Sequence, residues 1–185
     1  MRLLLLHQAD HLAAVALSEL QKIATLATTA TEDLPAAAIL AANFDAVLWL
    51  AGAVPIEEAS PTAEQLAQFS GKVLAIGAAH FALAKYYGTT ISQTNNYNRQ
   101  TPLLQTNNND KLLHHLPRQE MISLLLPQFS IQQLPNTLSP LAKSPEGLIL
   151  AWKHRNSPKQ GICFHPFATK WQHQGLVLIN IWLTV

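Results

Sequence analysis

The sequence has 185 residues, of which 49% are hydrophobic and only 12% are charged, and its formal net charge is +1. A chain of this length can bury a substantial core, and we predict one domain over residues 1–185. The near-neutral charge gives no basic footprint for nucleic acid, no apolar run approaches the ~20 residues that span a bilayer, and the single cysteine, Cys163, excludes an internal disulfide framework. We therefore expect a soluble cytoplasmic protein with neither a nucleic-acid nor a membrane partner.

The segment from Leu3 to Gly88 alternates between short apolar runs and helical patterns. Apolar runs of strand length occupy Leu3–Leu6, Ile23–Ala27, Ala46–Leu50 and Lys72–Ile76. Helical patterns occupy Ala9–Lys22, Leu34–Ala42, Pro61–Phe69 with Ser60 as its candidate cap, and Ala78–Tyr87, which ends at Gly88. Four β-α alternations predict an α/β protein with a doubly wound sheet.

The second half of the chain has a weaker pattern. Residues 89–116 are rich in Asn, Gln, Thr and Ser, which favours a surface excursion with turns, irregular backbone or edge strands. Strand-like apolar runs then return at Met121–Leu126, Gly147–Trp152 and Gly161–Phe164. The last apolar run, Gly175–Trp182, is compatible with a helix or a strand, because periodicity does not separate the two there.

The segment Val73–Gly88 reads as an apolar strand, a turn of small residues and a helix, which is the order found in a nucleophile elbow. The central position of such an elbow would be Gly77, which has no side chain with which to attack a substrate. Glycine adopts the strained backbone of an elbow without steric cost, so the geometry can persist without the nucleophile. An ordinary tight β-α turn is the alternative.

The segment Gly161–Ala168, GICFHPFA, resembles the end of a catalytic strand. In a His-Pro-acid arrangement a carboxylate orients the imidazole that acts as a base. Here His165 is present, but Phe167 occupies the place of the acid. Cys163 lies two residues before His165, so on a strand its thiol would face the same side. It is either an alternative nucleophile or a buried small hydrophobic residue.

The eight histidines do not point to a metal site. His114 and His115 are adjacent, so their side chains diverge on either a helix or a strand. We predict neither a metal nor another cofactor.

Taken together, these segments resemble the class I glutamine amidotransferases, in particular the small glutaminase subunits of anthranilate and aminodeoxychorismate synthases. The resemblance runs nearly from end to end. It is carried by Phe44–Val47 with the loop Ala51–Pro55, by the elbow Val73–Gly88, by Asn98–Pro117, by Ser123-Leu124 and by Pro145–Phe164 leading into His165-Pro166.

The departures from that family concentrate at the positions that carry its chemistry. The resemblance places Gly77 at the nucleophilic cysteine, Phe167 at the triad glutamate and His165 at the retained base. His80 matches the histidine of the elbow, whereas Phe81 replaces the glutamine after it. The other binding positions implied by the resemblance are Gly52, Val54 in place of a loop glycine, Ala78, Ser123 and Leu124.

The resemblance implies a three-layer α/β/α, flavodoxin-like fold with a mostly parallel sheet. It also implies loss of glutaminase activity, because a base without nucleophile or carboxylate has no acyl transfer to perform. We expect a pseudo-enzyme that acts as a binding or regulatory subunit, with a chorismate-utilising synthase-type subunit or a second copy of itself as partner.

Two alternatives stay open. One is an enzyme of another class that reuses the pocket around His165 and Cys163. The other is a small-molecule sensor with an apolar pocket at Phe81 and Phe167, two rings that would equally be able to plug it.

Overall fold

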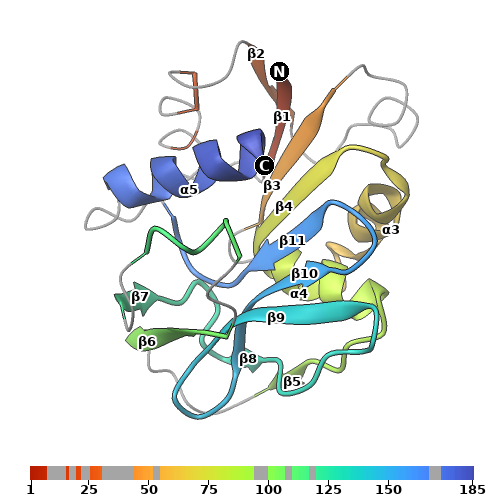
Figure 1. Ribbon diagram of the computed structural model, residues 1–185. Coiled ribbons are helices and arrows are strands. Elements are labelled where there is room, and N and C mark those ends of the chain that lie inside the picture. Colours follow the sequence, from red (N-terminus) through yellow and green to blue (C-terminus); the bar gives the residue numbers. More distant parts are fainter. Residues whose placement is uncertain are drawn as a thin grey trace.

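The computed structural model describes residues 1–7, 16, 20–21, 26–30, 44–51, 55–93, 100–106, 110–116, 120–166 and 172–185. Its strands are β1 (Arg2–His7), β2 (Leu26–Ala30), β3 (Ala46–Ala51), β4 (Lys72–Gly77), β5 (Ser92–Gln93), β6 (Gln100–Gln105), β7 (Glu120–Ser123), β8 (Phe129–Ser130), β9 (Leu138–Lys143), β10 (Ile149–His154) and β11 (Lys159–Ile162). The helices in these ranges are α3 (Ser60–Gln68), α4 (Ala78–Tyr86) and α5 (Gln172–Thr184), drawn in Figure 1. No helix of the described residues is long and apolar enough to cross a membrane.

The described strands form one nine-stranded sheet in the order β2-β1-β3-β4-β11-β10-β9-β6-β7, while β5 and β8 pair separately. The first five strands of this order are parallel. Counted along the chain, the parallel strands lie in the order 2-1-3-4-5, which is the flavodoxin-like doubly wound order. The α/β fold predicted from the sequence is confirmed.

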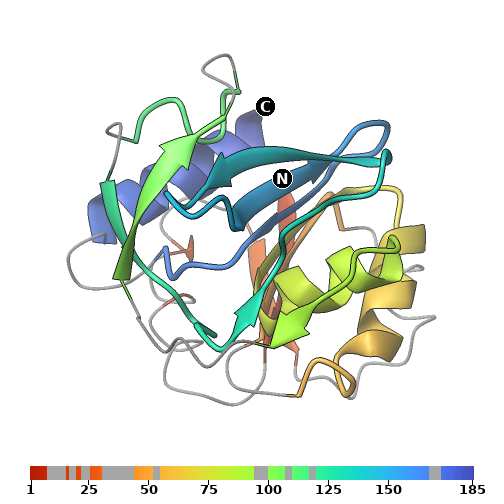
Figure 2. The same ribbon diagram turned by 90° about the horizontal axis from the view of Figure 1, so that it is seen from below.

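The central parallel strands are apolar along their whole length because both of their faces are covered. All six residues of β3 are buried, and the run Leu3–Leu6 of β1 is at most 2% exposed. Helices α3 and α4 lie on one side of the sheet and α5 lies on the other (Figures 1 and 2). The apolar run at the end of the chain lies in helix α5 and is not a strand. The two groups of helices and the sheet between them form the three layers of the α/β/α fold.

The strands after β11 in the sheet order are antiparallel to their neighbours. Strand β6 joins β9 through Leu104 and Gln105, and the Thr106 hydroxyl donates to the carbonyl oxygen of Pro140 at 2.8 Å. Leu103 is fully buried. The polar segment 89–116 is thus not only a surface excursion, since part of it enters the main sheet.

Several predicted boundaries differ from the structure. The second strand is described over Leu26–Ala30, and residues 23–25 of the predicted strand lie outside the described residues. Ala59 rather than Ser60 is the N-cap of α3. Ser60 is the first helical residue, and its hydroxyl donates to the carbonyl of Ile56 at 3.2 Å, so it bonds to the preceding turn instead of to the helix N-terminus. Of the predicted helix 9–22, the described Ala16 and Leu20 are helical and buried. The predicted helix 34–42 lies outside the described residues.

The pairing of β10 with β11 depends on a glycine that an indole ring covers. Trp152 lies opposite Gly161, and a Cβ atom on Gly161 would lie 2.6 Å from two carbons of the Trp152 ring. Trp152 is fully buried, so the ring has little space into which to move. Residue 161 is therefore restricted to glycine by packing rather than by its backbone.

We expect Gly161→Ala to lower the free energy of unfolding by about 1–3 kcal/mol, the usual penalty of overpacking a core. In a double-mutant cycle, Trp152→Phe should recover at least about 1 kcal/mol of that loss, because the smaller ring vacates the space over residue 161. Urea unfolding of the four proteins measures the coupling. Additive losses would show that the indole does not restrict this position.

Candidate functional site at the carboxyl end of the parallel strands

The turn from β4 into α4 has the geometry of a strained elbow. Gly77 is the last residue of β4 and the N-cap of α4, with φ 72° and ψ −127°. Residues with a Cβ atom rarely adopt this backbone conformation. It places residue 77 above the carboxyl end of the sheet, at a helix N-terminus. Ala78, the next residue, is buried in the first turn of α4.

The space above Gly77 is occupied by its neighbours. A Cβ atom built onto Gly77 would lie closer than 3.0 Å to the carbonyl oxygen of Ala51, a distance that real Cβ atoms do not show. It would also lie 3.1 Å from Cδ1 of Leu125. Ala51 is the register partner of Gly77 on β3, so the obstruction is backbone rather than a flexible side chain. No nucleophilic side chain fits at this position without a shift of β3.

The other predicted site residues meet beside this turn. The N–H of Leu125 donates to the carbonyl of Cys163 at 3.0 Å, and the N–H of His165 donates to the carbonyl of Ser123 at 3.2 Å. Between these bonds, Leu124 and Phe164 form an antiparallel bridge. The segment 123–125 is thus fixed against 163–165, which brings Ser123, Leu124, Cys163 and His165 together; their role in a site stays a prediction. Leu125, which closes the space over Gly77, was not predicted.

Cys163 is a buried thiol. It is 5% exposed, and burial raises its pKa to about 12. Its backbone N–H donates to the carbonyl of Leu150 at 3.0 Å. A nucleophilic cysteine needs a thiolate near neutral pH, and this environment favours the protonated form. The environment therefore agrees with a buried small hydrophobic residue and argues against an alternative nucleophile.

We expect Cys163 to react with iodoacetamide in the native protein at least about a thousandfold more slowly than in urea, because both its thiolate fraction and its access are reduced. Mass spectrometry of timed samples measures the two rates. Fast native labelling that His165→Ala suppresses would contradict this and support an enzyme built on the Cys163 and His165 pair.

His80 and Phe81 on α4 face the interior. His80 is fully buried, and burial lowers its pKa to about 3, with a smaller opposing contribution from the backbone of Gly161. Neither of its ring nitrogens has a hydrogen-bond partner of adequate geometry among the described residues. Its imidazole packs edge-on against Phe81, with ring centroids 4.8 Å apart, and lies 5.9 Å from the ring of Trp152. His80 is therefore a neutral core residue.

Phe81 on α4 lines a small cavity together with Leu124. It is 2% exposed and its ring centroid lies 6.0 Å from that of Phe129. The cavity that Phe81, Leu124 and Cys163 line holds only about 20 Å³, which is room for about one water molecule. This cavity beside Cys163 thus has no room for an amino acid, and Phe81 is one of the side chains that bound it.

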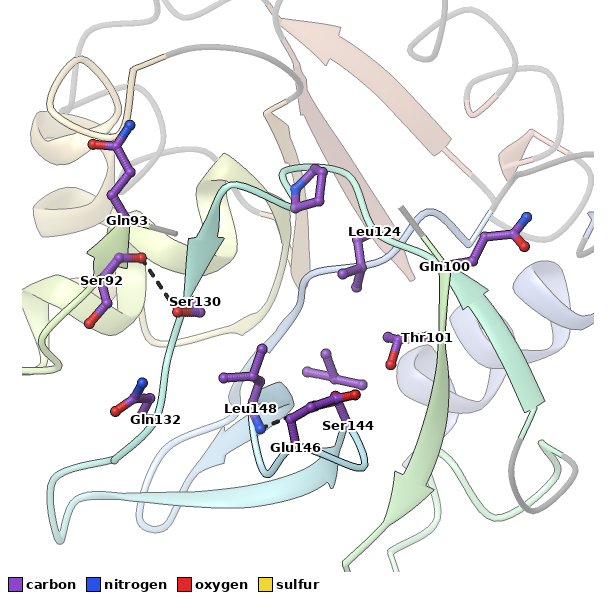
Figure 3. A pocket seen from close by; sticks show the side chains of 12 residues that line it. Ser92, Gln93, Gln100, Thr101, Leu124, Ser130, Gln132, Ser144, Glu146 and Leu148 are labelled. Atoms are coloured by element: carbon purple, nitrogen blue, oxygen red, sulfur yellow. Dashed lines mark hydrogen bonds between the residues drawn. The ribbon is translucent and has the colours of Figure 1, made fainter. Parts of the chain in front are cut away.

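A larger pocket of about 260 Å³ lies on the outer side of Leu124 (Figure 3). Its lining residues include the polar Ser92, Gln93, Gln100, Thr101, Gln132 and Ser144, while Leu124, Pro127, Leu148 and Leu150 give much of the wall an apolar surface. The pocket therefore offers a ligand both hydrogen-bonding groups and apolar surface.

Three predicted site residues, Gly52, Val54 and Phe167, lie outside the described residues. Their contribution to an oxyanion hole or to a plug stays a prediction. Within the described ranges, no group of three His, Cys, Asp or Glu side chains is placed to hold a metal ion.

Two solved structures resemble the chain closely in three dimensions. One, a GMP synthase component from Thermoplasma acidophilum, has a TM-score of 0.80 at 14% identity, covering 98% of this chain and 93% of that chain. The other, a glutamine amidotransferase from Thermotoga maritima, has a TM-score of 0.75 at 12% identity, covering 98% and 96%. No protein-family profile and no curated protein sequence matches the chain. At these identities the likeness defines the fold, and this chain has the glutamine amidotransferase-like, flavodoxin-type α/β fold.

Proposed function

We propose that this chain is a cytoplasmic glutamine amidotransferase-like pseudo-enzyme that acts by binding, as a regulatory or scaffold subunit, and does not hydrolyse glutamine. The observation that carries the proposal is the elbow at Gly77. Its strained backbone is kept, but the residue has no side chain, and the carbonyl of Ala51 occupies the place of a Cβ atom. A fold that retains an elbow and fills the space above it has no route to an acyl-enzyme intermediate.

Two further observations support this proposal. The cavity lined by Phe81, Leu124 and Cys163 has room for about one water molecule rather than an amino acid. The only thiol of the chain, Cys163, is protonated near neutral pH because burial raises its pKa to about 12. His165 then has neither a side chain at residue 77 nor a thiolate at residue 163 to activate.

The partner that fits this proposal is a chorismate-utilising synthase-type subunit, as in the anthranilate and aminodeoxychorismate synthases that the sequence resembles, or a second copy of the chain. Size-exclusion chromatography with light scattering, on the protein alone and mixed with such a synthase subunit, tests both. We expect one of two results. Either the chain forms a complex with the synthase subunit, and the complex makes the synthase product from ammonia but not from glutamine, or the chain alone is a homodimer. A monomer that binds no such subunit at tens of micromolar, or a complex that uses glutamine, would contradict the proposal.

A further inference from the structure

A second cavity, of about 420 Å³, opens at the other end of the sheet from Gly77 and His165. It lies where the parallel strands begin: Lys72 is the first residue of β4 and Lys159 is the first residue of β11. Lys72 and Gly77 are the two ends of β4, five residue steps apart, which is about 16 Å of extended chain. Ligands of doubly wound sheets bind at the carboxyl ends of the strands, so this cavity is distinct from the candidate site described above.

The wall of this cavity concentrates positive charge. Among the described residues, five of the chain's 12 lysines and arginines line it, with His154 beside them and one acidic side chain, Asp110. The cationic residues are Lys72, Lys111, Lys153, Arg155 and Lys159. A concave surface of one sign focuses its field and raises the local concentration of counter-ions. The near-neutral net charge of the chain hides this local excess.

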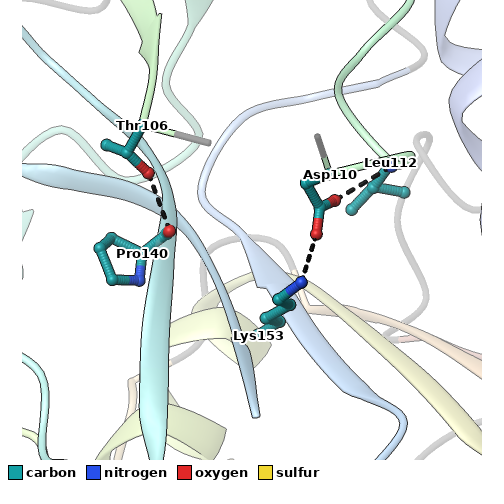
Figure 4. Close-up of polar contacts among 5 residues, drawn as sticks. All are labelled: Thr106, Asp110, Leu112, Pro140 and Lys153. Atoms are coloured by element: carbon teal, nitrogen blue, oxygen red, sulfur yellow. Dashed lines mark hydrogen bonds and ion pairs between the residues drawn. The ribbon is translucent and has the colours of Figure 1, made fainter. Parts of the chain in front are cut away.

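The one acidic side chain is already used. Asp110 is 7% exposed, one of its oxygens lies 2.6 Å from Nζ of Lys153, and the other accepts from the N–H of Leu112 at 3.0 Å (Figure 4). Asp110 therefore compensates Lys153, and no other acidic side chain of the described residues lines the cavity. Among the described residues, the exposed side chains of Lys111 and Arg155 have no ion-pair partner.

The two lysines at the strand ends are bound only by neutral groups. Nζ of Lys72 donates to the carbonyls of Trp182 and Leu183, at 3.3 and 2.8 Å. Nζ of Lys159 donates to the carbonyl of Phe69 and, at 2.7 Å, to that of Gly71. Carbonyl oxygens leave the full charge in place, and an ammonium has three donors, so Lys72 keeps one donor for a further acceptor. Nζ of Lys159 also lies over the Phe69 ring, 5.5 Å from its centroid, which is again a neutral partner.

Lys159 shows that the wall is short of negative charge. The residue is 1% exposed, and burial lowers its pKa to about 8. A buried cation without a charged partner is unfavourable, and an anion in the cavity would relieve it.

We propose that this cavity is a binding site for a small organic phosphate, with Lys111 and Arg155 contacting the phosphate group and Lys72 and Lys159 supplying fixed positive charge behind it. The volume lies in the range of small-molecule sites, whereas an acidic protein surface would need a broad, flat contact. Leu112, Pro158 and Ile181 give an apolar wall for the organic part. The site is independent of glutaminase chemistry and of its loss.

Calorimetric titration of the protein with adenosine monophosphate, inorganic phosphate and adenosine tests the proposal. We expect saturable binding of adenosine monophosphate that weakens with added salt and is absent for adenosine. The double variant Lys111→Gln, Arg155→Gln should raise Kd at least about tenfold, since two charge-assisted contacts are lost. Lys143→Gln removes a cation outside the cavity and should change Kd less than about twofold, because screening weakens a distant charge. Equal melting temperatures exclude unfolding as the cause.

Inorganic phosphate that binds as tightly, with the same dependence on both variants, would support a site that recognises the phosphate group alone. Three results would overturn the proposal: no saturable binding of either phosphate, equal Kd in the three proteins, or equal binding of adenosine. A further outcome is that poly-L-glutamate binds when neither phosphate does, and binds more weakly to the double variant but not to Lys143→Gln. That result would assign the cavity to an acidic protein instead.

Discussion

Replacing Gly77 with alanine is expected to lower the free energy of unfolding by about 3–5 kcal/mol, the largest effect of any substitution considered for this protein. Two causes combine. The φ of 72° is unfavourable for a residue with a Cβ atom, and that atom would overlap the carbonyl oxygen of Ala51 on β3. Neither cause is relieved by a rotamer change, because both involve the backbone.

Gly88→Ala is the matched control. Gly88 also has a positive φ, 93°, but a Cβ atom there would have no neighbour within 4 Å. Gly88→Ala should therefore lower the free energy of unfolding only by the cost of a positive φ for alanine, about 1–2 kcal/mol. Urea unfolding of the two variants separates strain from packing. Equal losses at residues 77 and 88 would show that Ala51 does not close the space above the elbow.

Gly77→Cys extends the same comparison to chemistry. We expect the restored thiol to be as destabilising as the alanine and to yield no ammonia from glutamine, because the β3 carbonyl and Leu125 occupy the attack position. A stable Gly77→Cys protein that releases ammonia would show that only the side chain at residue 77 was missing.

The second large effect is the pH dependence that His80 imposes. Its folded pKa is about 3, below the usual value of 6.5, because the ring is fully buried among aromatic neighbours. Between pH 6.5 and pH 3 the unfolded chain therefore binds more protons at His80 than the folded protein does. The contribution of His80 to the free energy of unfolding is highest above pH 6.5 and decreases as the pH falls toward 3. Between pH 7 and pH 5 the loss amounts to about 2 kcal/mol.

His80→Leu should remove that part of the pH dependence. The wild type is expected to lose about 2 kcal/mol more than His80→Leu between pH 7 and pH 5, as measured by urea unfolding at each pH. Lys159, with a pKa of about 8, stays protonated over this interval and contributes equally to both proteins. At pH 7 the variant should be as stable as the wild type or more stable, because two unpartnered ring nitrogens are removed. Parallel pH curves would mean that His80 is charged or solvated in the folded state.

Much of the fold follows from local patterns in the sequence. Apolar runs with no alternation identify β1, β3 and β4 as strands covered on both faces, and the small residues after Ile76 identify the turn at Gly77. Strand β9 was missed because Leu138–Lys143 contains Pro140, and proline ordinarily argues against a strand. The final helix α5 was ambiguous because its apolar residues surround it almost completely.

The sequence predicts which residues belong to the candidate site but not the contacts that close it. The order of segments was enough to associate Ser123 with His165, since both stand where a known family has site residues. The closure over Gly77 was not predictable, because it depends on the register of Ala51 and on the side chain of Leu125, which are contacts between distant segments. The basic cavity was missed for a similar reason: its lysines lie far apart in a chain whose net charge is +1.

Release of ammonia from L-glutamine by the purified protein, with His165→Ala as the matched variant, tests whether the chain has lost glutaminase activity. Both proteins are expected to give the rate of buffer alone, with and without a synthase-type partner present. Ammonia release by the wild type that His165→Ala abolishes would show that an active glutaminase site exists. It would contradict the proposal that the chain does not hydrolyse glutamine.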